Sequence, residues 1–280
     1  MRYALPSLFN INGQVAVVTG GGGVLCSEMA VALAELGAKV AVLSLHQEKA
    51  DKTADAVRQR GGEAVGIACD VTDASALAKA RDGVVNKFGG VDILVNGAGG
   101  NQKAATTGSV NAADAAAPTF WELSPDAVRK VFDLNFLGTF MAAQVFGQEM
   151  AKRRRGVIVN ITSMNAYRPL TKIAAYAAAK AAVANLTQWL AVHFAPLNIR
   201  VNAIAPGFFL TEQNRFLLTD EKTGEPTPRG KAILAHTPMQ RYGEPSDLIG
   251  ALVYLASTAS SFVTGTTIAV DGGFSAFSGV

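Results

Sequence analysis

Cysteine and histidine are scarce in this chain of 280 residues, which contains two cysteines and three histidines. Their spacing matches no metal-binding pattern, so we expect no metal site and interpret Cys26 and Cys69 as small buried hydrophobic side chains. The formal net charge is only +3, which argues against a nucleic-acid partner. The first ten residues lack the apolar core of a signal peptide, and no apolar run is long enough to cross a bilayer. We therefore expect a soluble, cytoplasmic protein with no membrane partner.

Hydrophobic residues make up 49% of the chain, which suits buried parallel strands covered by closely packed helices. The segments that predict strands are 14–19, 39–43, 64–69, 91–95, 157–161, 199–204 and 267–270. The segments that predict helices are 24–36, 48–60, 73–88, 124–155, the segment around Tyr176 up to Pro196, and 247–256. This alternation predicts an α/β fold with a doubly wound parallel sheet, in one domain over 1–280.

Two long segments, about 97–123 and 207–238, show no clear periodicity. Loops of this length in a compact domain are usually functional or mobile. We interpret both as loops that bind the substrate.

A possible catalytic group consists of Tyr176, Lys180 and Ser163. Positions i and i+4 share a helix face, so Lys180 should lie beside the Tyr176 phenol and lower its pKa. A serine hydroxyl after the preceding strand could hydrogen-bond the oxygen of a reacting alcohol or ketone, which suits proton transfer coupled to hydride transfer. The alternative is an ordinary exposed helix face, because Tyr-x-x-x-Lys alone is weak evidence.

The first predicted strand runs directly into T-G-G-G-G-V-L-C at 19–26 and then into a helix. Glycines in such a turn let the backbone approach a pyrophosphate at the N-terminus of the helix. In the first strand–turn–helix unit of an α/β fold, this pattern indicates a dinucleotide site.

Together these segments resemble the short-chain dehydrogenase/reductase family over nearly the whole chain. The matching pieces, in the family's order, are T-G-G-G-G at 19–23, D-V at 70–71, N-G-A-G at 96–99, D-L-N-F-L-G at 133–138, Ser163, Y-A-A-A-K at 176–180 and P-G-F-F-L-T at 206–211. The resemblance implies a Rossmann-type domain with a seven-stranded parallel sheet and helices on both faces. It also implies an NAD(P)-dependent oxidoreductase that acts on CH–OH groups.

The resemblance assigns roles by motif position. Tyr176 is the expected acid/base, and Lys180 is expected to lower its pKa and to hold the nicotinamide ribose. Ser163 is expected to orient the substrate oxygen, and Asn135 to hold a water in the proton relay. The alternative for Asn135 is a helix-interior asparagine with local hydrogen bonds.

The same resemblance gives a set of residues expected to bind NAD or NADP. They are Gly20, Gly22, Gly23, Val24, Leu25, Ser44, Asp70, Val71, Asn96, Gly97, Ala98, Tyr176, Lys180, Pro206, Gly207 and Thr211.

Three departures from the family pattern matter. Val24 and Cys26 stand where the family usually has glycine, so their side chains should narrow the pyrophosphate site or shift the first helix. Ser44 stands where NAD-preferring members often carry an acid, so neither cofactor is favoured. The loop after Asn96 is longer and richer in alanine than in most members.

A narrower resemblance concerns the substrate. The strings I-T-S-M-N-A, A-P-G-F-F-L-T-E-Q-N-R, H-T-P-M-Q-R and V-D-G-G-F-S-A-F-S-G-V resemble the D-mannonate oxidoreductase (fructuronate reductase) branch of the family. That resemblance implies interconversion of D-mannonate and D-fructuronate. A sugar acid needs a cation for its carboxylate and polar groups for its hydroxyls. The candidates are Asn101, Gln102, Asn165, Arg168, Lys172, Gln213, Asn214 and Arg215.

Several alternatives stay open. Arg168 and Lys172 could be solvated loop charges. The enzyme could instead reduce another polyol, a gluconate-type sugar or a small ketone. A cofactor-binding protein without catalysis is supported only by Val24 and Cys26. We interpret Trp189, His193 and Phe194 as core or interface, since the family resemblance implies a homotetramer in which their helix packs against its copy.

Overall fold

The computed structural model describes residues 5–114, 116–210, 218–220 and 223–279. Its centre is a seven-stranded sheet of order β3-β2-β1-β4-β5-β6-β7, in which every neighbouring pair is parallel. The strands are β1 Val15–Thr19, β2 Lys39–Ser44, β3 Ala64–Ala68, β4 Ile93–Asn96, β5 Gly156–Ile161, β6 Ile199–Pro206 and β7 Thr267–Val270. All seven predicted strands are therefore confirmed, with ends within two residues of those expected.

The strand order changes direction between β1 and β4. There Thr19 and Asn96 are register partners at the carboxyl ends of the two strands. Ligands of open α/β sheets bind in the crevice beyond such a point, because the connections after the two strands leave in opposite directions. The topology thus positions a site at the carboxyl edge, next to the glycine-rich turn.

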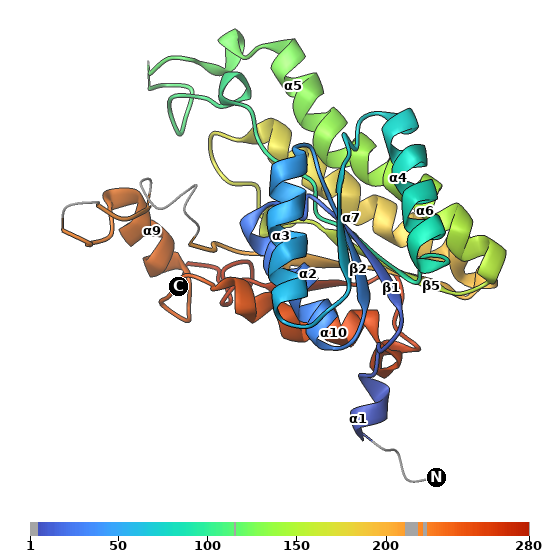
Figure 1. The fold of residues 1–280 in the computed structure, drawn as a ribbon. Helices are drawn as coiled ribbons and strands as arrows, with labels where there is room; N and C mark the ends of the chain where they lie inside the picture. The colour runs from blue at the N-terminus through green and yellow to red at the C-terminus, as the bar shows by residue number, and fades with distance from the viewer. Residues whose placement is uncertain (1–4, 115, 211–217, 221–222, 280) are drawn as a thin grey trace.

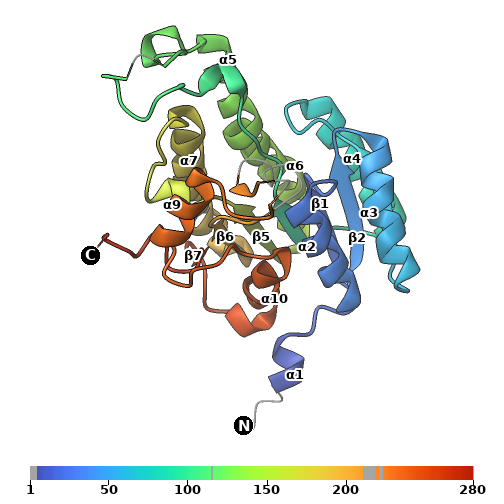
Figure 2. The ribbon, with the colours of Figure 1, turned by 90° about the vertical axis from the view of Figure 1, so that its left-hand side faces the viewer.

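Helices cover both faces of the sheet and divide the core in two. Helices α2 Val24–Glu35, α3 Gln47–Gln59 and α10 Ile249–Ala256 pack on one face. Helices α4 Ala74–Phe88, α6 Gly138–Arg153 and α7 Ala174–Phe194 pack on the other. Figure 1 shows α2 and α3 on one side of β1 and β2 and α4 and α6 on the other, and Figure 2 shows α7 beside β5 and β6. The Rossmann-type prediction is confirmed.

The helix predicted over 124–155 is not continuous, and this corrects the sequence-based prediction. Ser124 caps the start, since its side chain accepts a hydrogen bond from Ala127 N, and α5 covers Pro125–Phe132. A π-helical turn, η3, then covers Asp133–Leu137 before α6 begins at Gly138. π-turns inside helices are rare and often lie at functional sites. This one contains Asn135, which is completely buried.

The remaining elements are short. They are α1 Leu5–Leu8, η1 Lys103–Ala105, η2 Phe120–Glu122, η4 Met164–Ala166, η5 Ala195–Leu197, α9 Pro228–His236, η6 Pro245–Leu248 and η7 Thr258–Ser260. Two elements cover the helix predicted over 247–256. The first, η6, begins earlier, at Pro245, and α10 follows it directly. Both long segments predicted as loops contain helical turns. Within the parts of the chain described above, no helix is long and apolar enough to span a membrane.

Candidate active site

Helix α7 and strand β5 bring the predicted catalytic group together. Tyr176 lies in the first turn of α7, and a side-chain hydrogen bond joins it to Ser163, which follows β5. The Ser163 hydroxyl oxygen also accepts a hydrogen bond from Asn165 N at 3.2 Å. This contact uses only a lone pair of the oxygen, so the Ser163 proton can still be donated to the phenol or to a substrate oxygen.

Lys180 lies one turn after Tyr176 and is buried, with 4% of its surface exposed. Its Nζ donates to the Ile161 carbonyl at 2.8 Å and lies 5.7 Å from the centroid of the Tyr176 ring. Burial lowers the pKa of Lys180 to about 8, because an ammonium is poorly solvated there. The ammonium is thus held beside the phenol at the end of β5.

The pKa of Tyr176 is raised rather than lowered. Burial disfavours the phenolate, and the hydrogen bond from Ser163 opposes this effect only in part. The effect that Lys180 was expected to have on the Tyr176 pKa is not among the causes of this shift, and it stays a prediction. The pKa is raised because desolvation of the phenolate outweighs the interactions that favour it. Tyr176 consequently carries its proton at neutral pH.

Asn135 is held by the start of the long segment 97–123. Its Nδ2 donates to the carbonyls of Gly100 at 2.7 Å and Val131 at 2.8 Å, and its Oδ1 accepts from Gly100 N at 3.2 Å. The side chain therefore makes the local hydrogen bonds that the alternative interpretation expected. A Cβ on Gly99 would lie 2.7 Å from Asn135 Oδ1 and 3.0 Å from Lys180 Nζ, so Gly99 packs against both groups. Asn135 thus lies within the catalytic group, and its water-binding role stays a prediction.

The glycine-rich turn packs so closely on neighbouring segments that side chains at Gly20 and Gly22 would meet protein atoms. Gly20 has φ +65°, and a Cβ there would lie 2.8 Å from the Ala98 Cα. A Cβ on Gly22 would lie 2.7 Å from Ser44 Oγ. Helix α2 follows, with Gly23 as its N-cap and no side-chain hydrogen bond at the cap. The first N–H groups of α2 are therefore left for an anion, as a dinucleotide pyrophosphate requires, so these residues fit the predicted cofactor.

The two substitutions of family glycines have different consequences. Cys26 is buried, and a Cβ on Gly97 would lie only 2.1 Å from its Sγ, so the thiol lies directly beneath Gly97. The thiol therefore faces another predicted cofactor residue, and the narrowing of the pyrophosphate site by its side chain stays a prediction. Helix α2 begins at Val24 as predicted. The Val24 side chain is 37% exposed at this end of the helix.

The remaining predicted cofactor residues are spread along the carboxyl edge of the sheet. Ser44 ends β2 and is buried, whereas Asp70 and Val71 follow β3. Asp70 is exposed, and its Oδ1 accepts from Thr72 N at 2.8 Å. Leu25 lies in the first turn of α2, and Pro206 ends β6. Thr211 lies outside the described residues.

Asn96 points into the protein and starts a polar chain that sequence reasoning missed. Its Nδ2 donates to Asn160 Oδ1 at 2.9 Å, and Asn160 Nδ2 donates to Thr187 Oγ1 at 2.9 Å. All three side chains are buried. The chain thus ties α7 to β5 two turns beyond Lys180. The available signal was an asparagine within the apolar strand 157–161 and a threonine seven residues after Lys180.

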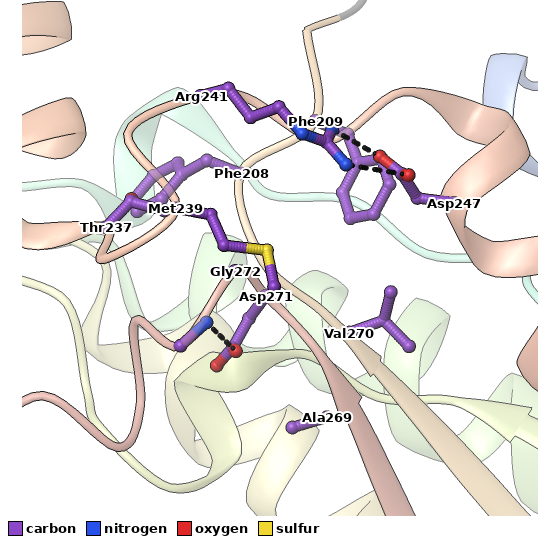
Figure 3. A pocket seen from close by; sticks show the side chains of 12 residues that line it. Phe208, Phe209, Thr237, Met239, Arg241, Asp247, Ala269, Val270, Asp271 and Gly272 are labelled. Atoms are coloured by element: carbon purple, nitrogen blue, oxygen red, sulfur yellow. Dashed lines mark hydrogen bonds and ion pairs between the residues drawn. The ribbon is translucent and has the colours of Figure 1, made fainter.

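A pocket of about 330 Å³ lies beyond the ends of β6 and β7 (Figure 3). Its wall includes a double hydrogen bond from Arg241 to Asp247, at 2.6 and 2.9 Å, and Asp271, which accepts from Gly273 N at 2.9 Å. A Cβ on Gly207 would lie 2.6 Å from the Asp271 Cα, so the pocket adjoins the predicted cofactor segment. The lining residues are Phe208, Phe209, Thr237, Met239, Arg241, Gly243, Asp247, Ala269, Val270, Asp271, Gly272 and Gly273. None of them was a predicted site residue, although the strings at 236–241 and 270–280 contain several.

The predicted substrate residues divide into two groups. Asn165 is adjacent to the catalytic group and buried, and its Oδ1 has no hydrogen-bond partner among the described residues. The others contact different parts of the chain. Arg168 Nε donates to the Ser275 carbonyl at 3.3 Å, Lys172 Nζ to the Gly108 carbonyl at 2.8 Å, and Asn101 Nδ2 to Thr106 Oγ1 at 2.9 Å.

Gln102 is exposed, and Gln213, Asn214 and Arg215 lie outside the described residues. Within those residues, no group of three His, Cys, Asp or Glu side chains could hold a metal ion.

Comparisons with known proteins agree with this geometry. A family model described as enoyl-(acyl carrier protein) reductase matches residues 25–275. An uncharacterized oxidoreductase, UxuB, from Bacillus subtilis is 48% identical over 99% of this chain and its own full length.

Two solved structures are similar along the whole chain. The first is a Haemophilus influenzae protein provisionally named D-mannonate oxidoreductase, solved with bound NAD. It is 46% identical, with a TM-score of 0.92 over 97% of this chain and 98% of that one. The second is a gluconate 5-dehydrogenase from Burkholderia cenocepacia in complex with NADP and tartrate. It is 33% identical, with a TM-score of 0.83 over 98% of this chain and 100% of that one.

Proposed function

Because the chain belongs to the short-chain dehydrogenase/reductase family, it is an NAD(P)-dependent oxidoreductase acting on CH–OH groups, and we propose that it interconverts D-mannonate and D-fructuronate. The observation that carries the proposal is the group of Tyr176, Ser163 and Lys180 at the carboxyl edge of the sheet. We assign the substrate by similarity to the Haemophilus protein.

The cofactor supplies or accepts the hydride at its nicotinamide ring. In our proposal the turn Gly20–Gly23 and the N-terminus of α2 hold its pyrophosphate, and Lys180 and Tyr176 hold its ribose. The packing of Gly20 against Ala98 supports this, since any larger residue would strike the Ala98 backbone and displace the turn. Both NAD and NADP bind to solved relatives, and Ser44 provides no carboxylate that would repel a 2′-phosphate.

Tyr176 and Ser163 would both interact with the substrate oxygen. During reduction, Ser163 donates a hydrogen bond to the ketone oxygen, while its own oxygen accepts one from Asn165 N. Tyr176 then gives its proton to the forming alkoxide, and the raised pKa ensures that the proton is present at neutral pH. During oxidation the steps are reversed, and Tyr176 must first lose this proton.

Two features support a polyhydroxylated acid as substrate. The buried, unpaired Oδ1 of Asn165 next to Ser163 can accept a hydrogen bond from a substrate hydroxyl. Arg168, five residues after Ser163, is exposed and offers a guanidinium for a carboxylate. The gluconate 5-dehydrogenase relative supports the alternative, a gluconate-type sugar.

The test is absorbance at 340 nm with purified protein, NADH or NADPH, and D-fructuronate beside 5-keto-gluconate and simple keto acids. We expect rapid oxidation of the reduced cofactor with D-fructuronate. Activity on another ketone alone would retain the reaction class and discard the substrate. Failure to turn over any ketone, with cofactor still bound, would contradict the proposal.

We further propose that the protein is a cytoplasmic homotetramer in which α7 packs against its copy. The support is an apolar surface on that helix, where Trp189 is 56% and Val192 is 79% exposed. The Trp189 ring stacks on His193, with centroids 4.5 Å apart, which holds the indole flat against the helix. Phe194 also contacts the His193 ring. The exposure of Trp189 and His193 favours an interface, whereas Phe194 is half-buried and packs against the core.

A further inference from the structure

We propose that Lys172 is a positioning residue that latches the long segment 97–123 onto the start of α7 and so makes this segment a fixed wall of the substrate site. The wall restricts the enzyme to compact ketones. The proposal rests on the proposed function, and it replaces the interpretation of Lys172 as a ligand of the substrate carboxylate.

Lys172 contacts the segment through both its side chain and its backbone. Its Nζ donates to the Gly108 carbonyl at 2.8 Å, and its own carbonyl accepts from Thr107 N at 3.0 Å. Its φ of +74° is a conformation that a lysine adopts at an energetic cost. The two hydrogen bonds therefore hold Lys172 in a defined position, unlike a solvated loop charge.

Two further contacts anchor the same segment near the catalytic group. At the start of the segment, the Asn135 side chain accepts a hydrogen bond from the Gly100 N–H and donates one to the Gly100 carbonyl. In the middle of the segment, Ala105 is completely buried in a cluster with Ala127, Val131, Ala175 and Ala179, against which the Tyr176 ring also packs. The segment therefore supports the side of α7 that carries the acid/base.

The contact between Lys172 and Gly108 also involves the later part of the segment, because Gly108 is itself bonded to that part. Gly108 N donates to the Pro118 carbonyl at 2.7 Å, and a Cβ on Gly108 would lie 2.3 Å from the Ala117 carbonyl oxygen. Through Gly108, Lys172 therefore holds two parts of the segment, the part around Gly108 and the part around Pro118. Since Lys172 is two residues before α7 begins and four before Tyr176, the latch fixes the wall relative to the phenol.

The hydrogen bonding of the Lys172 ammonium also favours a contact within the protein over a contact with the substrate. The Lys172 ammonium is partly buried and already donates to a carbonyl, so binding a carboxylate would require it to leave Gly108. Arg168, which is exposed, is the better partner for the acid. The contacts at Gly100, Ala105 and Gly108 oppose displacement of the wall by a bulky substrate.

The test compares Lys172→Met, which keeps the aliphatic stem and loses the ammonium, with Lys172→Arg, which keeps a donor. Trp121 lies within the segment and is 81% exposed, so in a Trp189→Phe background it is the only tryptophan and reports the motion of the wall. We expect the fluorescence anisotropy of Trp121 to fall in Lys172→Met and to stay near wild type in Lys172→Arg. This readout needs no substrate, so it tests the latch even if the proposed function fails.

Kinetics complete the test, with D-fructuronate, the uncharged ketose D-fructose and a bulky bicyclic ketone as probes. In Lys172→Met we expect KM for both sugars to rise by the same factor, about tenfold, and the preference over the bicyclic ketone to shrink. A loss confined to D-fructuronate, with unchanged anisotropy, would show that Lys172 binds the carboxylate and would overturn the latch. Unchanged anisotropy with unchanged selectivity would overturn it as well.

Discussion

Lys180 is the residue whose chemistry depends most on its place in the fold. Its ammonium is buried beside Tyr176, and only the Ile161 carbonyl is recorded as its hydrogen-bond acceptor among the described residues. Burying a cation costs free energy, and for this reason burial lowers the pKa of Lys180 to about 8. A position that is unfavourable for folding is thus retained at the proposed catalytic group, as is common at functional sites.

The first prediction concerns the pH dependence that Lys180 gives to stability. Its pKa is about 8 when folded and near its ordinary value of 10.5 when unfolded. Between these values the unfolded chain binds a proton that the folded protein has released, so the free energy of unfolding rises with pH. Urea unfolding from pH 7 to pH 10 should show this rise relative to Lys180→Met, which lacks the titrating group. Parallel curves for the two proteins would contradict the prediction.

At the scale of residues, motif spacing was sufficient to predict that Tyr176, Lys180 and Ser163 lie together. It could not give the direction of the Tyr176 pKa shift, which depends on burial. Nor could it identify Asn160 as part of a polar chain, since that requires the strand register. The interpretation of Lys172 depended on a contact with Gly108, 64 residues away in sequence, that no local pattern shows.

At the scale of elements, the strands were predictable because buried parallel strands are short, continuous apolar runs between glycine-rich turns. The π-turn Asp133–Leu137 was not, because the residues before and after it favour helix equally well. Its consequence is functional: the inserted turn places Asn135, whose side chain binds the backbone of Gly100 at the root of the long segment.

The second prediction concerns the glycine-rich turn between β1 and α2. Gly20 and Gly13 both have positive φ, +65° and +74°, but only a Cβ on Gly20 would meet the backbone of Ala98. Alanine at either site should cost about 1–2 kcal/mol for the left-handed conformation. Gly20→Ala should also weaken cofactor binding by tenfold or more, as a rough expectation for a displaced turn.

Isothermal titration with NADH and urea unfolding check this pair of variants. Gly13→Ala is the matched control, because nothing lies within 4 Å of a Cβ at that position. It should bind the cofactor like the wild type. Equal cofactor affinity in the two variants would mean that the turn does not hold the cofactor.

At the scale of the whole molecule, the fold places the chemistry on one edge of the sheet and leaves an apolar helix surface on α7. The architecture was predictable from the alternation of strands and helices, which determines a parallel sheet covered on both faces. The exposure of Trp189 and Val192 was not predictable, because it could be judged only once the other face of α7 was seen to pack on the sheet.

The third prediction tests the assembly. Val192→Glu places a charge in the proposed contact between copies of α7, where burial would leave it unpaired, so the tetramer should dissociate into smaller species. Light scattering after size-exclusion chromatography measures the mass. Leu5→Glu is the control, since Leu5 is 67% exposed on α1 and should leave the mass unchanged. An unchanged mass for Val192→Glu would place the interface elsewhere.

The most direct test of the whole account is the turnover of Tyr176→Phe beside the wild type, with cofactor affinity measured separately. Phenylalanine keeps the ring against the Ala105 cluster and removes only the hydroxyl that Ser163 bonds. We predict that kcat falls by roughly 10²–10⁴-fold, the usual contribution of a general acid or base, while cofactor binding is largely retained. Near-normal turnover by Tyr176→Phe would contradict Tyr176 as the proton donor and with it the proposed mechanism.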